Sequence, residues 1–358
     1  MMRVAVAMSG GVDSSVAAAL LRDRGWEVVG LSMNLGGPGA GGTDRRCCGG
    51  RDLLDARAVA SRLGIPYYAL DFHADFRREV LRPFADDYLR GRTPSPCILC
   101  NSELKFRRLQ TAARRLGASH LATGHYARMM RDESSGRFRL FQGADRGKDQ
   151  SYFLFNLGQE QLASLLLPLG DYTKAEVRRL AGEWRLPVAA KAESQDLCFA
   201  PSGDYRRVIQ AVAPGRSRKP GDIVDRDGRV LGRHDGLEGF TVGQRRGLGV
   251  AAEAPLFVVA LDPAGNRVIV GGRAEAGRRG LVADRVNWIP FPDPPARVEV
   301  EARIRSRHPG AAAVVRPGPG RTARVEFRSP QTGVAPGQAV VFFRRDEVLG
   351  GGWIREVY

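Results

Sequence analysis

The stretch Met8-Ser9-Gly10-Gly11-Val12-Asp13-Ser14-Ser15 decides the fold, because it joins an apolar run to a segment with helical periodicity. The run Arg3–Met8 predicts a buried strand, and Asp13–Arg24 predicts a helix. Small residues let backbone amides approach a phosphate, hydroxyl groups add donors, and a helix N-terminus adds partial positive charge. The stretch is therefore predicted to cradle a phosphate. It lacks the lysine of GTPase loops and the spaced glycines of the dinucleotide fingerprint, which disfavours hydride chemistry.

The first two hundred residues alternate short β-branched runs with helical segments, a pattern typical of a parallel sheet covered by helices. Further strands are expected at Glu27–Met33, Tyr67–Phe72 and His120–Thr123, and further helices at Arg51–Leu63, 101–116 and Thr173–Trp184. The 101–116 helix is amphipathic and basic. Residues 127–143 predict an inserted antiparallel hairpin around a Ser-Ser-Gly turn.

The pattern changes near Lys219, where the runs become short and rich in turn residues. We therefore expect three domains: an α/β parallel-sheet domain over 1–212, a small β-rich middle domain over 213–276 and a C-terminal β-barrel over 280–358. In the third region, Arg297–Arg305, Thr322–Phe327 and Ala339–Phe343 alternate as strands. A chain of 358 residues is long enough to bury a large core, and it shows no internal repeat.

The chain carries a net charge of +16, which would attract phosphate polyanions such as nucleic acid. Arginine-rich solvated faces explain the same charge equally well. Position adds to the functional interpretation, since residues 285–328 hold nine arginines against four acids, with Arg303, Arg305 and Arg307 expected on one face of a strand. Trp353 could stack on a base but is more typical of a barrel core.

No apolar run approaches the ~20 residues of a membrane span, and the N-terminus lacks the apolar core of a signal peptide. We expect a cytoplasmic protein. Five cysteines, an odd number, argue against a disulfide framework and favour reactive or metal-binding thiols.

Two cysteine-containing strings are candidates for chemistry. Cys97-Ile-Leu-Cys100 follows a proline-stiffened segment and opens the basic helix, where the helix dipole and neighbouring cations would stabilise a thiolate. Cys198 lies on a later loop and, taken alone, is as a rule a small buried hydrophobe. The vicinal pair Cys47-Cys48 lies after the second strand, and a structural role is favoured over one near a nucleotide.

These strings together resemble the tRNA-specific 2-thiouridylase family over essentially the whole chain. Ser9–Ser14 is similar to the PP-loop, SGGxDS, of the ATP pyrophosphatase superfamily, whose members form an adenylate and release pyrophosphate. Other matching strings follow in the family's order: Arg92-Thr-Pro-Ser-Pro with Cys100-Asn101, Ala122-Thr-Gly-His-Tyr126, Lys148-Asp-Gln-Ser-Tyr-Phe153, Cys198-Phe199, Gly243-Gln-Arg-Arg-Gly-Leu-Gly249 and Pro336-Gly-Gln338.

The resemblance implies a PP-loop domain, a small middle domain and a C-terminal barrel, and an enzyme that thiolates C2 of the wobble uridine in tRNA. ATP and Mg²⁺ would be bound by Met8, Ser9, Gly10, Gly11, Val12, Asp13, Ser14 and Ser15, with Met33 and Gly124 at the adenine. Asp13, which would help hold Mg²⁺, could also cap the helix. Cys100 would be the nucleophile and Cys198 would carry a persulfide. Contacts to tRNA would come from Ser95, Pro96, Cys97, His125, Lys148, Asp149, Gln150, Arg305, Ser306 and Gln338.

Cys97 departs from the family, many of whose members have Asp at this position. Cys97, Cys100 and Cys198 could hold three corners of a [4Fe–4S] cluster with one iron left open. Three cysteines are more than a persulfide route requires, which favours the cluster, whereas Cys-x-x-Cys pairs also occur without metal. Both routes stay open, and the sulfur donor would be a cysteine desulfurase, a sulfur-relay protein or free sulfide.

Two rival functions remain. Another PP-loop ligase would use ATP on a small carboxylate or base and would not need Cys100 and Cys198. A non-catalytic RNA-binding or redox-sensing protein would keep the basic barrel but would not need an intact PP-loop. The loop here is intact.

Overall fold

The computed structural model describes residues 2–36, 50–192, 197–200, 203–216 and 219–358. Cys47 and Cys48 therefore lie outside the described residues. The chain divides into two compact units. The first comprises Met1–Val80, Cys97–Tyr205 and Asp346–Val348, and the second comprises Leu81–Pro96, Arg206–Arg345 and Leu349–Tyr358.

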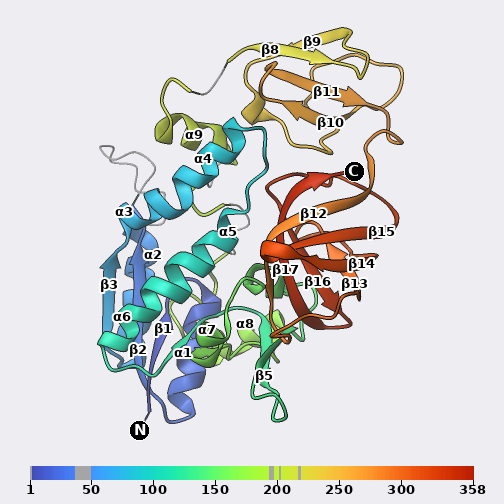
Figure 1. Ribbon diagram of the computed structural model, residues 1–358. Coiled ribbons are helices and arrows are strands. Elements are labelled where there is room, and N and C mark those ends of the chain that lie inside the picture. The colour runs from blue at the N-terminus through green and yellow to red at the C-terminus, as the bar shows by residue number, and fades with distance from the viewer. Residues whose placement is uncertain (1, 37–49, 193–196, 201–202, 217–218) are drawn as a thin grey trace. The chain divides into compact units, whose positions relative to one another are not determined.

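The first unit is built on a five-stranded parallel sheet, as the alternating pattern predicted (Figure 1). Its strands run in the order β3-β2-β1-β4-β7, so the strand order reverses direction beside β1. Ligands of open α/β sheets bind at the carboxyl ends of the strands at such a point. The strands are β1 (Arg3–Ala7), β2 (Glu27–Asn34), β3 (Tyr67–Asp71), β4 (His120–Ala122) and β7 (Leu165–Leu166).

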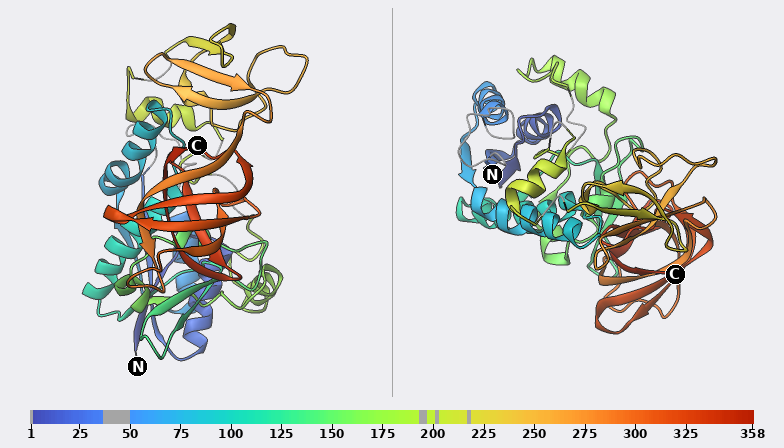
Figure 2. Two further views of the ribbon diagram at one scale, coloured as in Figure 1. Left: turned by 45° about the vertical axis from the view of Figure 1, so that its right-hand side comes forward. Right: turned by 90° about the horizontal axis from the view of Figure 1, so that it is seen from above.

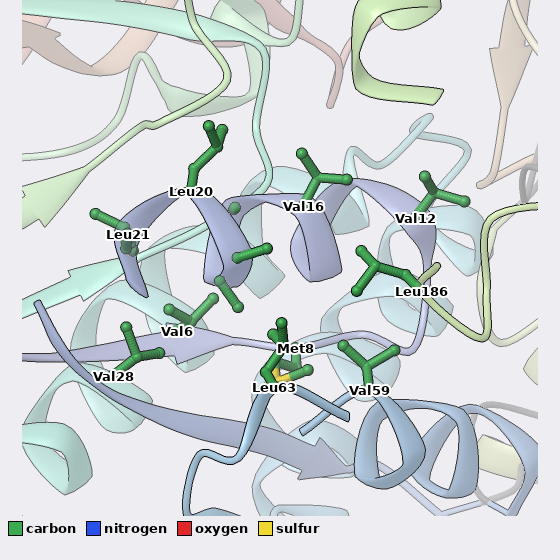
Figure 3. Packing of buried hydrophobic residues seen from close by; sticks show 14 of the residues in the cluster. Val6, Met8, Val12, Val16, Leu20, Leu21, Val28, Val59, Leu63 and Leu186 are labelled. Carbon is green, nitrogen blue, oxygen red and sulfur yellow. The ribbon is translucent and has the colours of Figure 1, made fainter. Parts of the chain in front are cut away.

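Helices join these strands, and their apolar faces form the core of the sheet. Buried side chains from α1, β1, β2 and α2 lie in one cluster with Leu186, as Figure 3 shows. The helical elements in or at the edge of this unit are α1 (Val12–Asp23), α2 (Gly50–Leu63), α3 (His73–Phe76), η1 (Arg77–Leu81), α5 (Pro96–Leu99), η2 (Cys100–Leu109), α6 (Gln110–Arg115), η3 (Ser151–Leu154), α7 (Gln159–Ala163) and α8 (Lys174–Glu183). The helix α9 (Tyr205–Val212) begins at the last residue of this unit and otherwise belongs to the second.

The segment predicted as one amphipathic helix over 101–116 is helical but not uniformly α. From Cys100 to Leu109 it forms a π-helix, and α6 then continues it. Leu104, Leu109 and Ala113 are buried as the periodicity predicted. Apolar spacing does not separate i+4 from i+5 bonding over so short a segment, so the π-helix was not foreseen. Such segments are frequent at functional sites.

The predicted hairpin is present as β5 (Ala127–Arg131) and β6 (Phe138–Gln142), which pair antiparallel. Glu347 and Val348, which belong to the first unit, pair with Phe141 and Leu140 of β6.

The second unit contains a four-stranded sheet and a closed barrel. The small sheet has the order β10-β11-β8-β9, and pairing of β12 with β17 closes the ring β12-β15-β14-β13-β16-β17 around its own apolar core (Figure 2). The unit also holds α4 (Arg82–Leu89), η4 (Leu237–Gly239) and η5 (Pro319–Arg321). The strands are β8 (Gly221–Val224), β9 (Val230–His234), β10 (Phe257–Asp262), β11 (Arg267–Gly271), β12 (Gly277–Trp288), β13 (Val298–Arg303), β14 (Ala311–Gly318), β15 (Thr322–Thr332), β16 (Ala339–Arg344) and β17 (Glu347–Val357).

The expectation of three arginines on one strand face is wrong. β13 ends at Arg303, and the chain then turns, with the His308 amide donating to the Arg305 carbonyl. Arg303 donates to Glu301 and lies over the Phe343 ring, whereas Arg305 and Arg307 are exposed on the turn. Arginines continue to alternate in the sequence beyond the end of the strand, so a prediction from their spacing alone made the strand too long. Trp353 is buried, with the Arg285 guanidinium 4.3 Å from its ring centroid.

None of the helices among the described residues is both long enough and apolar enough to cross a membrane.

Candidate active site

The carboxyl ends of β1 and β4 border a cavity of about 440 Å³ in the first unit. Its walls bring together residues that sequence analysis assigned to separate roles. From the candidate nucleotide set, Met8, Ser9, Gly11, Val12, Asp13, Ser14, Met33 and Gly124 line it, and from the candidate sulfur and tRNA sets, Cys100, Cys198, His125, Lys148 and Gln150 line it.

Hydroxyl groups give the loop between β1 and α1 its shape. The Ser9 amide donates to Ser14 Oγ at 3.1 Å, and Ser15 Oγ donates to the Gly11 carbonyl at 2.8 Å. Ser15 is fully buried and does not line the cavity. The candidate phosphate ligands are thus the residues before it, and Ser15 shapes the loop.

At two positions the backbone of another segment lies so close that only glycine fits. Gly10 adopts a φ of +73°, and a Cβ there would lie 2.2 Å from the Asp52 carbonyl oxygen. A Cβ on Gly124 would lie 2.7 Å from the Ser14 amide nitrogen. The end of β4 therefore rests directly on the start of α1, and a side chain at either position would displace the loop.

Asp13 lies in the first turn of α1 and is held by two donors. Its Oδ1 accepts from the Tyr126 hydroxyl at 2.8 Å and from Lys174 Nζ at 2.6 Å. The N-cap is Gly11, and no side chain caps the helix, so the expectation that Asp13 caps it is wrong. Its carboxylate is turned to Tyr126 and Lys174 instead.

Lys191 closes the side of the cavity beside α2. Its ammonium donates to the Gly10 carbonyl at 2.9 Å, to Asp52 at 2.7 Å and to Asp55 at 2.5 Å. Burial alone would lower the pKa of Lys191, but the hydrogen bonds that it donates to the two carboxylates raise the pKa above its ordinary value. The lysine therefore stays charged throughout the physiological range.

The three described cysteines are close enough for their charges to interact. Desolvation raises the pKa of Cys100 to about 11, although Lys105 opposes the shift. Although Cys97 is exposed, surrounding protein atoms desolvate its thiol and raise its pKa, and Cys198 and Cys100 raise it further. The expected stabilisation of a thiolate at the helix start is thus wrong for the protein without substrate, because loss of solvent outweighs the nearby cation.

Cys97 does not line the cavity, and its side chain is exposed at the start of the helix. Among the described residues, no three His, Cys, Asp or Glu side chains lie at the spacing that a single metal ion needs.

His125 is buried and packs against the π-helix that begins at Cys100. Its Nδ1 shares a 2.7 Å hydrogen bond with Thr123 Oγ1, and its ring packs on Phe106. Burial, and then the charge of Lys105, hold the pKa of His125 well below its ordinary value. The imidazole is therefore neutral at physiological pH.

The remaining candidate tRNA residues are not among those that line the cavity. Asp149 accepts hydrogen bonds from Gln142 and from the amides of Gly143 and Ser151. In the second unit, Gln338 Nε2 donates to the carbonyls of Thr93 and Pro94, so the barrel holds the segment before Cys97. Arg305 and Ser306 are exposed on the turn after β13, and neither Ser95 nor Pro96 lines the cavity.

Comparison with known proteins decides the family. Three family models match the chain: a tRNA methyl transferase HUP domain over 2–202, a tRNA methyl transferase PRC-barrel domain over 211–272 and an aminomethyltransferase β-barrel domain over 278–354. The tRNA-specific 2-thiouridylase MnmA of Moorella thermoacetica is 52% identical over 356 residues, covering 98% of this chain and 99% of that protein. The chain belongs to the tRNA-specific 2-thiouridylase family.

A second member of the 2-thiouridylase family, from Acidobacterium capsulatum, is 48% identical and covers 98% of each chain. A solved structure of the U34-tRNA thiolase NcsA from Methanococcus maripaludis with its [4Fe–4S] cluster is 21% identical. It covers 60% of this chain and 67% of that one with a TM-score of 0.33, a likeness too low to support any conclusion.

Several cavity residues of this 2-thiouridylase family member were not foreseen from sequence. Asp52, Thr123, Tyr126, Lys174 and Lys191 all line the cavity. Tyr126 lay within a string quoted for the resemblance, and nothing in that string set its ring apart. Lys174 and Lys191 lie more than a hundred residues from the loop they contact, and no local pattern distinguishes them from other surface lysines.

Proposed function

We propose that this chain converts the wobble uridine of tRNA into 2-thiouridine, and that ATP activates the base. One observation carries the proposal: a single cavity is lined both by the loop after β1 and by Cys100 and Cys198. A ligase acting on a small molecule would need the loop but not the two thiols. The names of the relatives, tRNA-specific 2-thiouridylases over nearly the full chain, support the same reaction.

The chemistry explains why ATP is needed. O2 of uracil is a poor leaving group, so sulfide attack at C2 would stall. Transfer of AMP to O2 releases pyrophosphate and converts the oxygen into part of AMP, which sulfur then expels as it bonds to C2. The target base must leave its stack to enter such a cavity.

The residues present fit a magnesium nucleotide. Small and hydroxyl-bearing residues line the loop at a helix N-terminus, an arrangement that receives phosphate. Asp13 offers the carboxylate oxygen that Mg²⁺ prefers, and the ammonium of Lys174 beside it adds positive charge. Bound Mg²⁺ would neutralise charge on the departing pyrophosphate.

Sulfur delivery through a persulfide fits the cavity, since both thiols it needs line the wall. With a persulfide on Cys198, the Cys100 thiolate attacks the Cys198 sulfur and forms a disulfide. Hydrosulfide leaves with the bond electrons and attacks C2 of the activated base. An external thiol must then reduce the disulfide before another turnover.

The cluster route would use Cys97 as a third ligand. Cys97 does not line the cavity that Cys100 and Cys198 line. The proposal therefore gives sulfur transfer to Cys100 and Cys198, the two thiols that line the cavity.

The remaining partners follow from this reaction. The tRNA would supply the uridine, and a cysteine desulfurase or sulfur-relay protein would load Cys198 with persulfide sulfur. Free sulfide, in vitro, would instead attack the activated C2 directly and expel AMP without a persulfide. We expect the reaction to take place in the cytoplasm with its tRNA substrate.

The test is a reaction of purified protein with ATP, Mg²⁺, unmodified tRNA transcript and a persulfide donor. We expect AMP and pyrophosphate to form only with tRNA that has the wobble uridine, and mass spectrometry of nucleosides to detect 2-thiouridine. Asp13→Ala should abolish AMP formation. Equal ATP turnover with a small carboxylate and no RNA would favour the ligase instead.

The same assay separates the sulfur routes. Iron-free Cys97→Asp protein should retain thiolation, whereas Cys100→Ala and Cys198→Ala should each abolish it. Loss of both iron and thiolation in Cys97→Asp, with full activity of an iron-loaded protein, would establish the cluster route.

A further inference from the structure

Lys191 contacts three groups that belong to two separate segments of the first unit. Its Nζ atom lies 2.9 Å from the Gly10 carbonyl oxygen, 2.7 Å from Asp52 Oδ1 and 2.5 Å from Asp55 Oδ2. An ammonium group has three donors, and three acceptors surround this one. Lys191 lies in none of the sequence motifs quoted above.

The position of Lys191 is itself set by the surrounding structure. Its amide donates to the Val188 carbonyl, and Arg178 of α8 donates to the carbonyls of Ala189 and Lys191. Asp52 and Asp55 come from the first two turns of α2, whose backbone presses directly on Gly10. The ammonium is therefore held at the back of the loop by groups that do not belong to the loop.

The bond to Gly10 fixes the orientation of one peptide group. The Gly10 carbonyl and the Gly11 amide belong to the same planar trans peptide, so they point in opposite directions. When Lys191 holds the oxygen, the Gly11 N–H must point away from Lys191. Glycine at both ends of this peptide offers little resistance to its reversal, so an external restraint decides which way it faces.

We propose that Lys191 is a positioning residue that keeps the Gly10–Gly11 peptide turned so that its N–H, not its carbonyl, is offered to the nucleotide phosphates. This inference rests on the proposed ATP binding. Reversal of the peptide would present a carbonyl oxygen to an anion and remove a donor from the cradle. Asp52 and Asp55 serve to hold the ammonium against the Gly10 oxygen.

The rival explanation is that Lys191 leaves its carboxylates and contacts phosphate directly. The two explanations predict opposite changes in ATP affinity when one of the carboxylates is neutralised. If Lys191 positions the loop, Asp55→Asn loosens it and weakens ATP binding. If Lys191 is a phosphate ligand, Asp55→Asn frees it and strengthens ATP binding.

The experiment measures binding of ATP with Mg²⁺, and of adenosine, to the full chain by isothermal titration calorimetry without tRNA. We expect Lys191→Met to lower ATP affinity about tenfold or more, because the charge-assisted hydrogen bond to the Gly10 carbonyl is lost. Adenosine affinity should stay unchanged, because adenosine has no phosphates for the loop to bind. Asp55→Asn should lower ATP affinity by a smaller factor. Lys219→Met, an exposed lysine of the second unit, is the matched control and should bind both as the wild type does.

Thermal melting of each variant checks that it folds. If Lys191→Met does not fold, Asp55→Asn still decides between the two explanations. Tighter ATP binding by Asp55→Asn, or ATP affinity unchanged in both variants, would overturn the positioning role and leave the proposed function intact. A wild-type chain that binds no ATP would overturn both.

Discussion

Gly124 shows how little room the end of β4 leaves beside the phosphate-binding loop. A methyl group there would meet the Ser14 amide nitrogen at 2.7 Å and the Asp13 carbonyl carbon at 2.8 Å. Both are backbone atoms, so the loop itself must move. We expect Gly124→Ala to lower the free energy of unfolding by about 1–3 kcal/mol, as overpacking does, and to weaken ATP binding. Thermal melting and calorimetry measure the two effects.

Gly182→Ala is the matched control for this prediction. Gly182 lies inside α8, and a Cβ there meets nothing within 4 Å. Alanine is the better helix former by about 1 kcal/mol, so this variant should melt at or above the wild-type temperature. Equal melting temperatures and equal ATP affinities for both variants would refute the close approach at Gly124.

The Cys100 thiol is expected to stay protonated in the protein without substrate. Burial raises its pKa to about 11, so the thiolate fraction is small at neutral pH and rises about tenfold for each pH unit below that value. Alkylation of Cys100 by iodoacetamide should therefore keep accelerating from pH 7 to beyond pH 9, as peptide mass spectrometry would record. An ordinary cysteine, with a pKa of ~8.5, would level off within this range.

Lys105 provides the internal control. Its charge lowers the pKa of Cys100, so Lys105→Met should slow alkylation of Cys100 at every pH in the range. A rate that levels off near pH 8.5 in the wild type would contradict a raised pKa. A Cys100 that reacts only slowly at rest implies that bound substrate activates it, which protects the thiol between turnovers.

At the scale of elements, an ion pair with a buried carboxylate anchors the hairpin β5–β6. Arg139 Nε and Nη2 donate to the two carboxylate oxygens of Glu347 at 2.7 and 2.6 Å, and the Glu347 side chain is only 9% exposed. We expect Glu347→Ala to cost about 2 kcal/mol of unfolding free energy, since it leaves the guanidinium partly buried without this partner. Hydrogen exchange should accelerate at the amides of β6.

Glu183→Ala tests whether any lost ion pair has this effect. Glu183 pairs with Arg179 one turn away on α8, and both side chains are more than half exposed. Such a pair contributes about 0.5 kcal/mol or less. If the two variants lost equal stability, burial would not be what strengthens the pair with Glu347.

Most elements could be predicted because their signal is local. β1, α1, β2, α2 and the hairpin all appear within a few residues of the expected bounds, since apolar periodicity and turn residues act on neighbours in sequence. The π-helix at Cys100–Leu109 and the turn after Arg303 could not be predicted. In both, backbone bonding departs from the pattern of side chains that the sequence displays.

The residues of the candidate site also fall into a predictable group and an unpredictable group. The loop at 8–15 and the cysteines stand in short strings whose chemistry is readable, and most of them line one cavity. The groups that orient them, Lys174 on Asp13 and Lys191 on Gly10, come from distant segments and form only when the sheet and α8 assemble. These orienting contacts exist only in the folded unit, so a single sequence does not predict them.

At the scale of the whole molecule, the positive charge is not evenly available to a polyanion. Many arginines are engaged with carboxylates, among them Arg303 with Glu301, Arg316 with Glu326 and Arg139 with Glu347. Arg305 and Arg307 are exposed on the turn after β13. The net charge of +16 therefore sets the long-range attraction, while fewer side chains are placed to touch phosphate.

This distinction predicts how tRNA binding responds to salt. Each phosphate contact releases counterions, so the logarithm of affinity should fall linearly with the logarithm of salt concentration. The slope per contact is about −0.9 for B-DNA and about −0.7 for single strands, which sets the range expected for tRNA. We expect Arg305→Ala to make the slope shallower by about one contact. Arg303→Ala should leave the slope unchanged and lower the melting temperature instead, because the Arg303 side chain donates to Glu301 and packs over the Phe343 ring. Filter binding of unmodified tRNA at several salt concentrations measures the slopes. If Arg303→Ala alters the slope and Arg305→Ala does not, tRNA lies along the strand face of the barrel and not on its turn.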